Sequence, residues 1–173
     1  MRLFIAINFN VETKSRLLAL REDLQNNVQC GRFSLPENLH LTLAFLGECT
    51  QDQISAAKNT MTTVSFEPLT LTIDHIGYFK RDSRSIYWAG VNPCRPLLDL
   101  QCNLFESLRS FGFMLENRKY SPHITLAREV VGKYPCGNIE PFGEMINAIN
   151  LMKSERINGK LTYTSILKQE AGR

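Results

Sequence analysis

The pentapeptide His40-Leu41-Thr42-Leu43-Ala44 recurs 83 residues later (123 − 40) as His123-Ile124-Thr125-Leu126-Ala127. Both copies lie in short runs of apolar and β-branched residues, which predict β-strands. Alternate side chains of a strand share one face, so the histidine and the threonine of each copy point the same way while the residues between them point to the core. Two such strands facing each other would bring two imidazoles and two hydroxyls into one cleft.

The repetition makes these positions candidate site residues. A single His-x-Thr in a strand is usually a half-buried polar pair without chemistry. The chain contains only three histidines, however, and two of them occupy matching positions in the repeat. His40 and His123 are therefore the candidate catalytic residues, and Thr42 and Thr125 are candidate substrate-binding residues. His75 has no counterpart in the repeat, and we interpret it as a structural histidine.

The segments that precede the two pentapeptides also correspond. An apolar strand is predicted at residues 2–8 and another at 85–91, followed by helical patterns at about 11–27 and 96–111. The distance from the start of the strand to the histidine is 38 residues in both copies (40 − 2 and 123 − 85). This ungapped repeat indicates a duplication, and hence two similar lobes related by an approximate two-fold axis.

The remaining sequence predicts more strands than helices. Residues 69–79 alternate in polarity and predict a strand that pairs with 85–91, while Asn158-Gly159 predicts a hairpin turn. Residues 130–143 hold three glycines and two prolines and predict a loop. Thr50 and the residues after it form a capping-box pattern that predicts another helix. We therefore expect an α+β fold with antiparallel sheets lining a central cleft, helices outside and pseudo-two-fold symmetry.

Length and composition indicate one compact domain. At 173 residues the chain can bury a sizeable core, whereas 38-residue half-units are too small to fold alone, so we expect a single domain at residues 1–173. No apolar run approaches the roughly 20 residues that span a bilayer, and the run at 3–7 is too short for a signal peptide. The five cysteines show no ligand spacing. We expect a cytoplasmic protein with reduced thiols, without a metal ion or other cofactor, and take a monomer as the starting assumption.

The net charge of +3 does not by itself indicate a nucleic-acid-binding protein. For most of the basic residues near the predicted hairpin loop and the second pentapeptide, simple solvation is the better interpretation; they are Lys80, Arg81, Arg84, Arg118 and Lys119.

Phe45 and Arg128 each lie five residues after a motif histidine. In a regular strand this position lies on the face opposite the histidine, so Arg128 could reach the cleft only if the strand ended or bulged. An aromatic side chain in one copy and a cation in the other would break the symmetry of the site. For Phe45, stacking on a nucleobase and ordinary core packing both remain open.

Two histidines across a cleft suit phosphodiester cleavage without a metal ion. The unperturbed pKa of histidine is about 6.5, so near neutral pH one imidazole can act as a base and the other, protonated, as an acid. In-line attack on the phosphorus of a phosphodiester needs these groups on opposite sides of that atom. The two threonine hydroxyls could donate hydrogen bonds to the non-bridging oxygens.

The duplicated motif resembles the 2H phosphoesterases. Residues 2–7, LPENLHLTLAFLGE at 35–48, Tyr87-Trp88 and YSPHITLAR at 120–128 are similar to the branch that contains RNA 2′,3′-cyclic phosphodiesterases and 2′-5′ RNA ligases. The similarity covers nearly the whole chain and is weakest between residues 129 and 144.

The resemblance implies hydrolysis of RNA 2′,3′-cyclic phosphate ends to 2′-phosphates. It implies His40 as proton donor to the 3′-oxygen, His123 as proton acceptor from water, a contribution of Arg128 to the site, and Phe45 stacked on the terminal base. Run in reverse, the reaction would join a 5′-hydroxyl to the cyclic phosphate and give a 2′-5′ linkage. The expected partners are RNA ends with a 2′,3′-cyclic phosphate, such as tRNA halves, or cyclic nucleotides.

Two other functions stay open. A non-catalytic RNA-end binder would use the same cleft without turnover, although both motifs are intact. A phosphodiesterase for a small cyclic nucleotide or a 2′-5′ oligonucleotide would share the same chemistry and differ in its loops.

Overall fold

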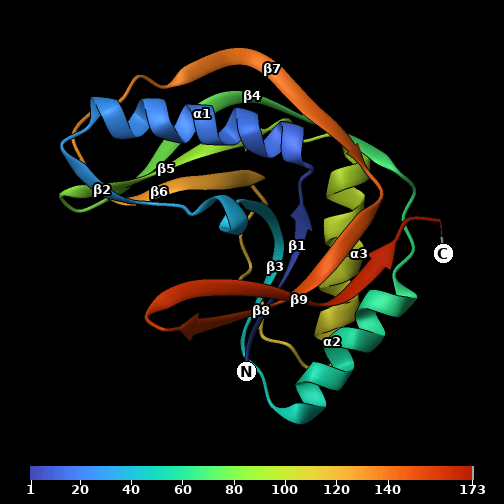
Figure 1. The fold of residues 1–173 in the computed structure, drawn as a ribbon. Coiled ribbons are helices and arrows are strands. Elements are labelled where there is room, and N and C mark those ends of the chain that lie inside the picture. The colour runs from blue at the N-terminus through green and yellow to red at the C-terminus, as the bar shows by residue number, and fades with distance from the viewer. Residues whose placement is uncertain (173) are drawn as a thin grey trace.

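Nine strands and three α-helices make up residues 1–172, the part of the chain that the computed structural model describes (Figure 1). In chain order they are β1 (Arg2–Asn8), α1 (Val11–Asn27), β2 (Cys30–Phe33), a 3-10 turn (Pro36–Asn38), β3 (His40–Glu48), α2 (Gln51–Thr63), β4 (Leu69–Arg81), β5 (Arg84–Val91), α3 (Arg95–Ser110), β6 (His123–Val131), β7 (Gly137–Ile146), β8 (Ala148–Ile157) and β9 (Lys160–Glu170). None of these helices is both long and apolar enough to cross a membrane.

The strands form two antiparallel sheets. Sheet A has the order β3-β1-β8-β9, and sheet B has the order β2-β6-β5-β4-β7. Every pairing within them is antiparallel. Since the helices are segregated to the outer sides of these sheets, the predicted α+β class is confirmed (Figure 1).

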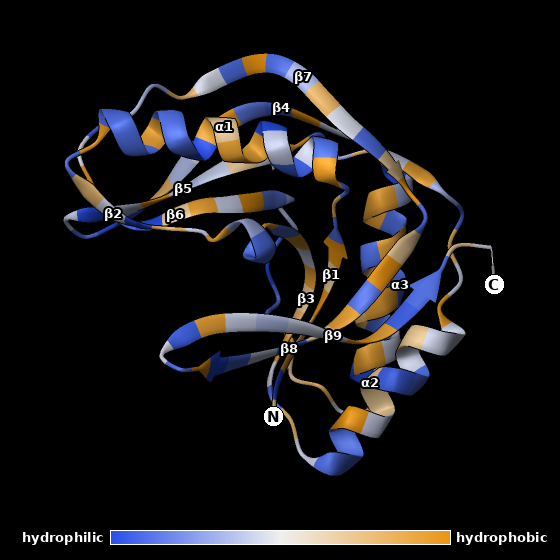
Figure 2. Ribbon diagram, in the orientation of Figure 1, coloured by the Kyte–Doolittle hydropathy of each residue, from blue (hydrophilic) through white to orange (hydrophobic). Residues whose placement is uncertain are grey.

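Each half of the repeat sends its helix to the other half's sheet. Strand β1 belongs to sheet A, but the helix that follows it, α1, packs on β2, β6 and β7 of sheet B. Strand β5 belongs to sheet B, but the helix that follows it, α3, packs mainly on β3 and on α2, which covers β8 and β9, while it also contacts β4 of its own sheet. Hydrophobic and hydrophilic segments alternate along α1 and α3, as expected of helices with one buried face (Figure 2). Residues of both halves therefore form one continuous hydrophobic core.

Local sequence signals account for the boundaries of several elements. The Asn10 side chain accepts a hydrogen bond from the Thr13 amide at 2.8 Å and caps α1. Thr50 forms the predicted capping box at the start of α2. Asn158 and Gly159 have φ values of 51° and 79° between β8 and β9, which is the geometry of the predicted hairpin turn.

The loop predicted at residues 130–143 is confirmed only at 132–136 and is wrong on either side of them. Strand β6 continues to Val131, and β7 begins at Gly137 and pairs with β4. Pro141 is tolerated because β7 is an edge strand and because residues 139–141 fall in an irregularity between the pairs Ile73–Phe142 and His75–Asn138. Gly143 is required for the pairing itself, since a Cβ atom there would lie 1.8 Å from the backbone oxygen of Leu71. Composition alone concealed this strand, because its proline depends on an irregular edge pairing and its glycine on a close approach to β4.

The repeat is also not ungapped in space. His40 lies opposite Asn8 on β1, whereas His123 lies opposite Gly90 on β5. One residue more therefore separates the two strands in the second copy. The strand-to-histidine distance of 38 residues is equal in the two copies only if the second strand starts at residue 85. In the structure β5 begins one residue earlier, at Arg84.

Candidate active site

His40 and Thr42 are the first and third residues of β3, and His123 and Thr125 hold the same places in β6. All four side chains are partly exposed, while the residues between them are buried. This is the alternation that the sequence predicts. We call the side of the two sheets that carries these four residues the motif face.

Both motif imidazoles are held by the same kind of contact. The Nδ1 atom of His40 lies 2.7 Å from the backbone oxygen of Asn38, and that of His123 lies 2.8 Å from the backbone oxygen of Ser121. A carbonyl oxygen can only accept, so each Nδ1 carries a hydrogen and each neutral ring leaves Nε2 free to take a proton. Nε2 of His40 lies 3.0 Å from the hydroxyl oxygen of Thr42. Nε2 is thus the nitrogen available for proton transfer in both rings, and at His40 the Thr42 hydroxyl can donate a hydrogen bond to it.

A β-bulge occurs at the same place in both motif strands. Leu43 has no partner on β1, because Thr42 and Ala44 pair with consecutive residues there. Leu126 is skipped in the same way where β6 pairs with β5. Each bulge resets the alternation by one residue, so Phe45 and Arg128 return to the motif face. The condition that the sequence sets for Arg128 to reach the site is therefore met.

Burial and nearby charge lower the pKa of both histidines. Burial is the largest cause for His40, whose pKa falls from 6.5 to about 4, and the positive charges of Arg128, Lys14 and His123 lower it further. Burial also lowers the pKa of His123, with a further contribution from Arg128, while the carbonyl partners act in the opposite direction on both rings. Strands β3 and β6, which carry the two motifs, contact each other, so the two histidines lie on adjoining strands of the two sheets.

Aromatic side chains surround the two imidazoles. The His40 ring centroid lies 4.8 Å from that of Phe4 on β1 and 5.2 Å from that of Tyr163 on β9. The His123 ring centroid lies 5.1 Å from that of Phe79 on β4 and 5.9 Å from that of Trp88 on β5. Sequence reasoning missed Tyr163, because nothing in its own segment marks the register that brings β9 beside the first motif.

Phe45 is not a core residue. Its side chain is 52% exposed, so ordinary core packing is wrong for it. The guanidinium carbon of Arg2 lies 5.0 Å from the centre of its ring. One face of the phenyl ring thus already holds a cation, as the electrostatics of an aromatic ring favour.

His75 is hydrogen-bonded, in keeping with the structural role predicted for it. Its Nδ1 atom lies 2.6 Å from the carboxylate of Asp74, which also accepts a hydrogen bond from Asn92 at 2.9 Å. The ring packs over Gly90, where a Cβ atom would lie 2.1 Å from His75 Nε2. Since Gly90 pairs with His123, the third histidine lies in the same cross-strand row as the second motif.

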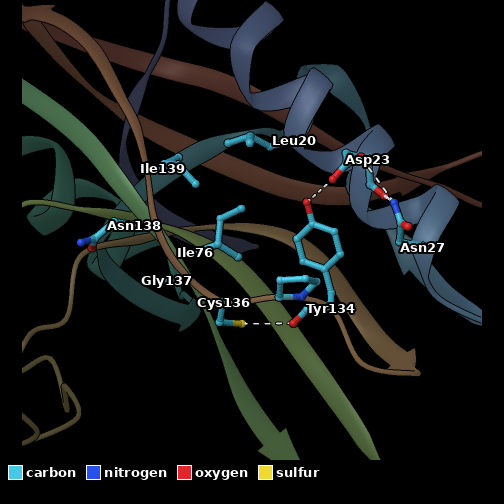
Figure 3. A pocket seen from close by; sticks show the side chains of 10 residues that line it. Leu20, Asp23, Asn27, Ile76, Tyr134, Cys136, Gly137, Asn138 and Ile139 are labelled. Carbon is cyan, nitrogen blue, oxygen red and sulfur yellow. Dashed lines mark hydrogen bonds between the residues drawn. The ribbon is translucent and has the colours of Figure 1, made fainter.

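A pocket of about 440 Å³ lies on the face of sheet B opposite the motif face (Figure 3). Ile76 lines it, and Ile76 points away from the motif face because its neighbour His75 points toward it. The Tyr134 hydroxyl points to the Asp23 carboxylate of α1 and donates a hydrogen bond to it. No motif residue lines this pocket. Residues 1–172 also contain no group of three or more His, Cys, Asp and Glu side chains placed to hold a metal ion.

Two antiparallel sheets with a bulged His-x-Thr strand in each define a 2H phosphoesterase, and the comparisons agree with this class. Residues 7–87 match the family described as LigT like phosphoesterase. An RNA 2′,3′-cyclic phosphodiesterase of Thermotoga maritima is 38% identical over 138 residues, which cover 78% of this chain and 72% of the relative. Another, of Archaeoglobus fulgidus, is 28% identical over 155 residues, with coverages of 84% and 85%.

The solved structures agree as well. Escherichia coli LigT complexed with 3′-AMP matches with a TM-score of 0.86 and 28% identity, over 99% of this chain and 98% of that one. This chain belongs to the LigT-like phosphoesterases, and it is therefore a hydrolase of phosphate esters.

Proposed function

We propose that this protein hydrolyses the 2′,3′-cyclic phosphate ends of RNA to 2′-phosphates, with His40 and His123 as acid and base. The observation that carries the proposal is the shared orientation of the two imidazoles, each with Nδ1 hydrogen-bonded to a carbonyl oxygen, which leaves Nε2 as the nitrogen that can take or give a proton. The names of the relatives from Thermotoga maritima and Archaeoglobus fulgidus support the substrate.

In the proposed reaction, Nε2 of His123 takes a proton from a water molecule while the water oxygen forms a bond to phosphorus. The bond between phosphorus and the ribose 3′-oxygen breaks, and protonated Nε2 of His40 gives its proton to that oxygen. The phosphate remains on the 2′-oxygen. Both histidines then return to their starting states when a proton passes back from His123 to His40 through solvent.

The proposal requires a protonated His40, although its pKa in the free protein is lowered to about 4. Two of the causes of this low value, the charges of Arg128 and His123, are those that a bound phosphate would offset. A negative phosphate beside His40 favours the imidazolium form and raises its pKa. Substrate binding would thus itself supply the acid.

The remaining motif-face residues bind substrate in this proposal. Thr42 and Thr125 donate hydrogen bonds to the non-bridging phosphate oxygens, most strongly as charge builds in the transition state. Arg128 contacts the phosphate, and the free face of Phe45 stacks on the terminal base. Acid, base and anion-binding groups all come from side chains, so we expect the reaction to proceed without a metal ion.

Run in reverse, the same groups would join a 5′-hydroxyl to a cyclic phosphate and form a 2′-5′ linkage. We expect a monomer acting on RNA ends such as tRNA halves. The other candidate functions are a phosphodiesterase for a small cyclic nucleotide and a non-catalytic RNA-end binder.

The deciding experiment is turnover of an RNA ending in a 2′,3′-cyclic phosphate, in the presence of a chelator, with the position of the product phosphate identified. A 2′-phosphate is expected. A 3′-phosphate would reverse the assignment of the leaving oxygen, and binding without turnover would leave an RNA-end binder.

A further inference from the structure

Four arginines from four strands line a groove of about 290 Å³ beside the motif face. They are Arg32 of β2, Arg81 of β4, Arg84 of β5 and Arg128 of β6. Glu129 is the one carboxylate among the lining residues, and its oxygens lie 3.4 Å from a nitrogen of Arg32 and 3.6 Å from a nitrogen of Arg84. Within residues 1–172, Arg81 and Arg128 have no ion pair. The groove therefore carries a strong excess of positive charge.

The strand register places these charges against one another. Arg32 lies directly opposite Arg128, and Arg81 lies directly opposite Arg84. Like charges at opposed positions of a sheet are destabilising. A protein that places two such pairs side by side, with a single carboxylate between them, has a surface that an anionic ligand would stabilise.

The groove is continuous with the candidate active site. Arg128 lines the groove and also lowers the pKa of both motif histidines. The bulge at Leu126 brings Arg128 to the motif face of β6, and Arg32 lies directly opposite Arg128 on β2. The groove thus opens onto the space that holds both imidazoles.

The distance from His123 to Arg84, at the far end of the groove, exceeds the reach of one nucleotide. Gly90 lies opposite His123, and Arg84 is six residues away along β5, which is about 20 Å in an extended strand. Between them, Trp88 and Ile86 lie on the same face, and Phe79 packs on Trp88 with ring centroids 5.2 Å apart. A positive groove next to partly exposed apolar and aromatic side chains is the usual surface for single-stranded nucleic acid.

We propose that the four-arginine groove binds backbone phosphates of a single-stranded RNA whose cyclic end lies at His40 and His123. This inference rests on the proposed function and deepens it by assigning a place to the RNA strand that leads to the cyclic end, whereas a free cyclic nucleotide would occupy only the histidine end. Arginine suits the task because its planar fork can hold two oxygens of one phosphate.

The test compares three variants. The double variant Arg81→Gln/Arg84→Gln removes two groove charges, Glu129→Gln removes the competing carboxylate, and Arg95→Gln removes an exposed charge on α3, where Arg95 pairs with Asp99 at 2.8 Å. The probe is a 5′-labelled oligoribonucleotide of about ten nucleotides ending in a 2′-phosphate, and the reference ligand is a mononucleoside 2′-phosphate. Affinity is measured by fluorescence anisotropy and competition over a series of potassium chloride concentrations.

The double variant should bind the oligoribonucleotide roughly threefold to tenfold more weakly, and its salt dependence should flatten by about 0.7 in log–log slope for each phosphate that is no longer neutralised. Glu129→Gln should bind it more tightly, a gain that damage to the fold would not produce. Arg95→Gln should match the unsubstituted protein, and the mononucleotide should bind all three variants with unchanged affinity.

An unchanged affinity and salt slope in the double variant would overturn the proposal. So would an equal loss for the mononucleotide, because the arginines would then belong to the catalytic phosphate site. If polyglutamate displaced the RNA when both were present at the same concentration of negative charges, the groove would be assigned to an acidic protein partner and not to RNA. The binding measurement does not require turnover, so failure of the proposed hydrolysis would appear separately, as an unsubstituted protein that binds RNA and leaves its cyclic end intact.

Discussion

The hydroxyl of Tyr120 donates a hydrogen bond to the backbone oxygen of Thr42, at 2.9 Å, and joins the approach to the second motif to the strand of the first. Burial raises the pKa of this phenol, so it stays protonated and remains a donor at all physiological pH values. The bond connects residues 78 positions apart in the chain. The relative placement of the two motifs therefore depends in part on a single side chain.

Tyr120→Phe should lower the free energy of unfolding by about 1 kcal/mol, because the Thr42 carbonyl loses a buried partner. It should also lower kcat, since the two histidines would no longer be held in register. Urea unfolding and steady-state kinetics measure both effects. Tyr78→Phe is the matched control, since Tyr78 is 51% exposed and lies outside the site. Equal effects of the two variants would show that Tyr120 has no special role in placing the motifs.

Replacing either motif histidine should abolish most of the activity. His40→Ala and His123→Ala should each reduce the rate by on the order of 10²–10⁴-fold, while Thr42→Ala and Thr125→Ala should cost about one to three kcal/mol of transition-state stabilisation.

The unsubstituted protein should keep its rate in a chelator. Loss of activity in the chelator and its return with a divalent ion would disprove the two-histidine mechanism.

Stability should fall in mild acid because of His40. The pKa of this group is about 4 in the folded protein and near 6.5 in the unfolded chain, so the unfolded chain takes up its proton first as the pH falls. Above pH 6.5 this group makes no pH-dependent difference, and between 6.5 and about 4 it lowers the free energy of unfolding by at most about 1.4 kcal/mol per pH unit. His40→Gln should reduce that slope in urea unfolding. An identical slope in the variant would mean that burial does not lower the pKa of His40.

Phe45→Ala should weaken RNA binding by roughly 1–3 kcal/mol if its ring stacks on the terminal base. A cyclic phosphate substrate that lacks a base should be unaffected. Kinetics with both substrates decide the matter. Equal losses on the two would show that Phe45 supports the site only by holding Arg2.

Arg128→Ala should harm every cyclic phosphate substrate alike, whatever its base or length. Arg128→Lys should restore activity only in part, since an ammonium group lacks the planar fork of a guanidinium. Removing the charge should also raise the pKa of both motif histidines, because Arg128 lowers them in the folded protein. NMR titration of the two imidazoles measures this directly. Unchanged titration curves would place Arg128 too far away to act on them.

Local signals carried most of the sequence prediction of the fold. The strand alternation of the motifs, the capping box at Thr50 and the turn at Asn158-Gly159 depend on neighbours a few residues apart, so they can be recognised without tertiary information. The edge strand β7 could not, because its proline and glycine are tolerated only by their place in sheet B.

The residue types of the candidate site could be proposed from the sequence, but its geometry could not. The two bulges that return Phe45 and Arg128 to the motif face follow from cross-strand pairing, which no local pattern specifies. The convergence of Tyr163 on His40, and of Arg32 on Arg128, likewise depends on strands that are distant in sequence.

The exchange of α1 and α3 between the sheets has a consequence for how such a protein could arise and fold. A single half on its own would leave one face of its sheet uncovered and the apolar face of its helix unpacked. It could bury these two surfaces only by exchanging helices with a second copy. In this protein the exchange takes place within one chain, so segments that are distant in sequence must come together before either sheet is covered. Such non-local contacts slow folding, and they also mean that a cut between the halves should yield two fragments that acquire structure only when mixed.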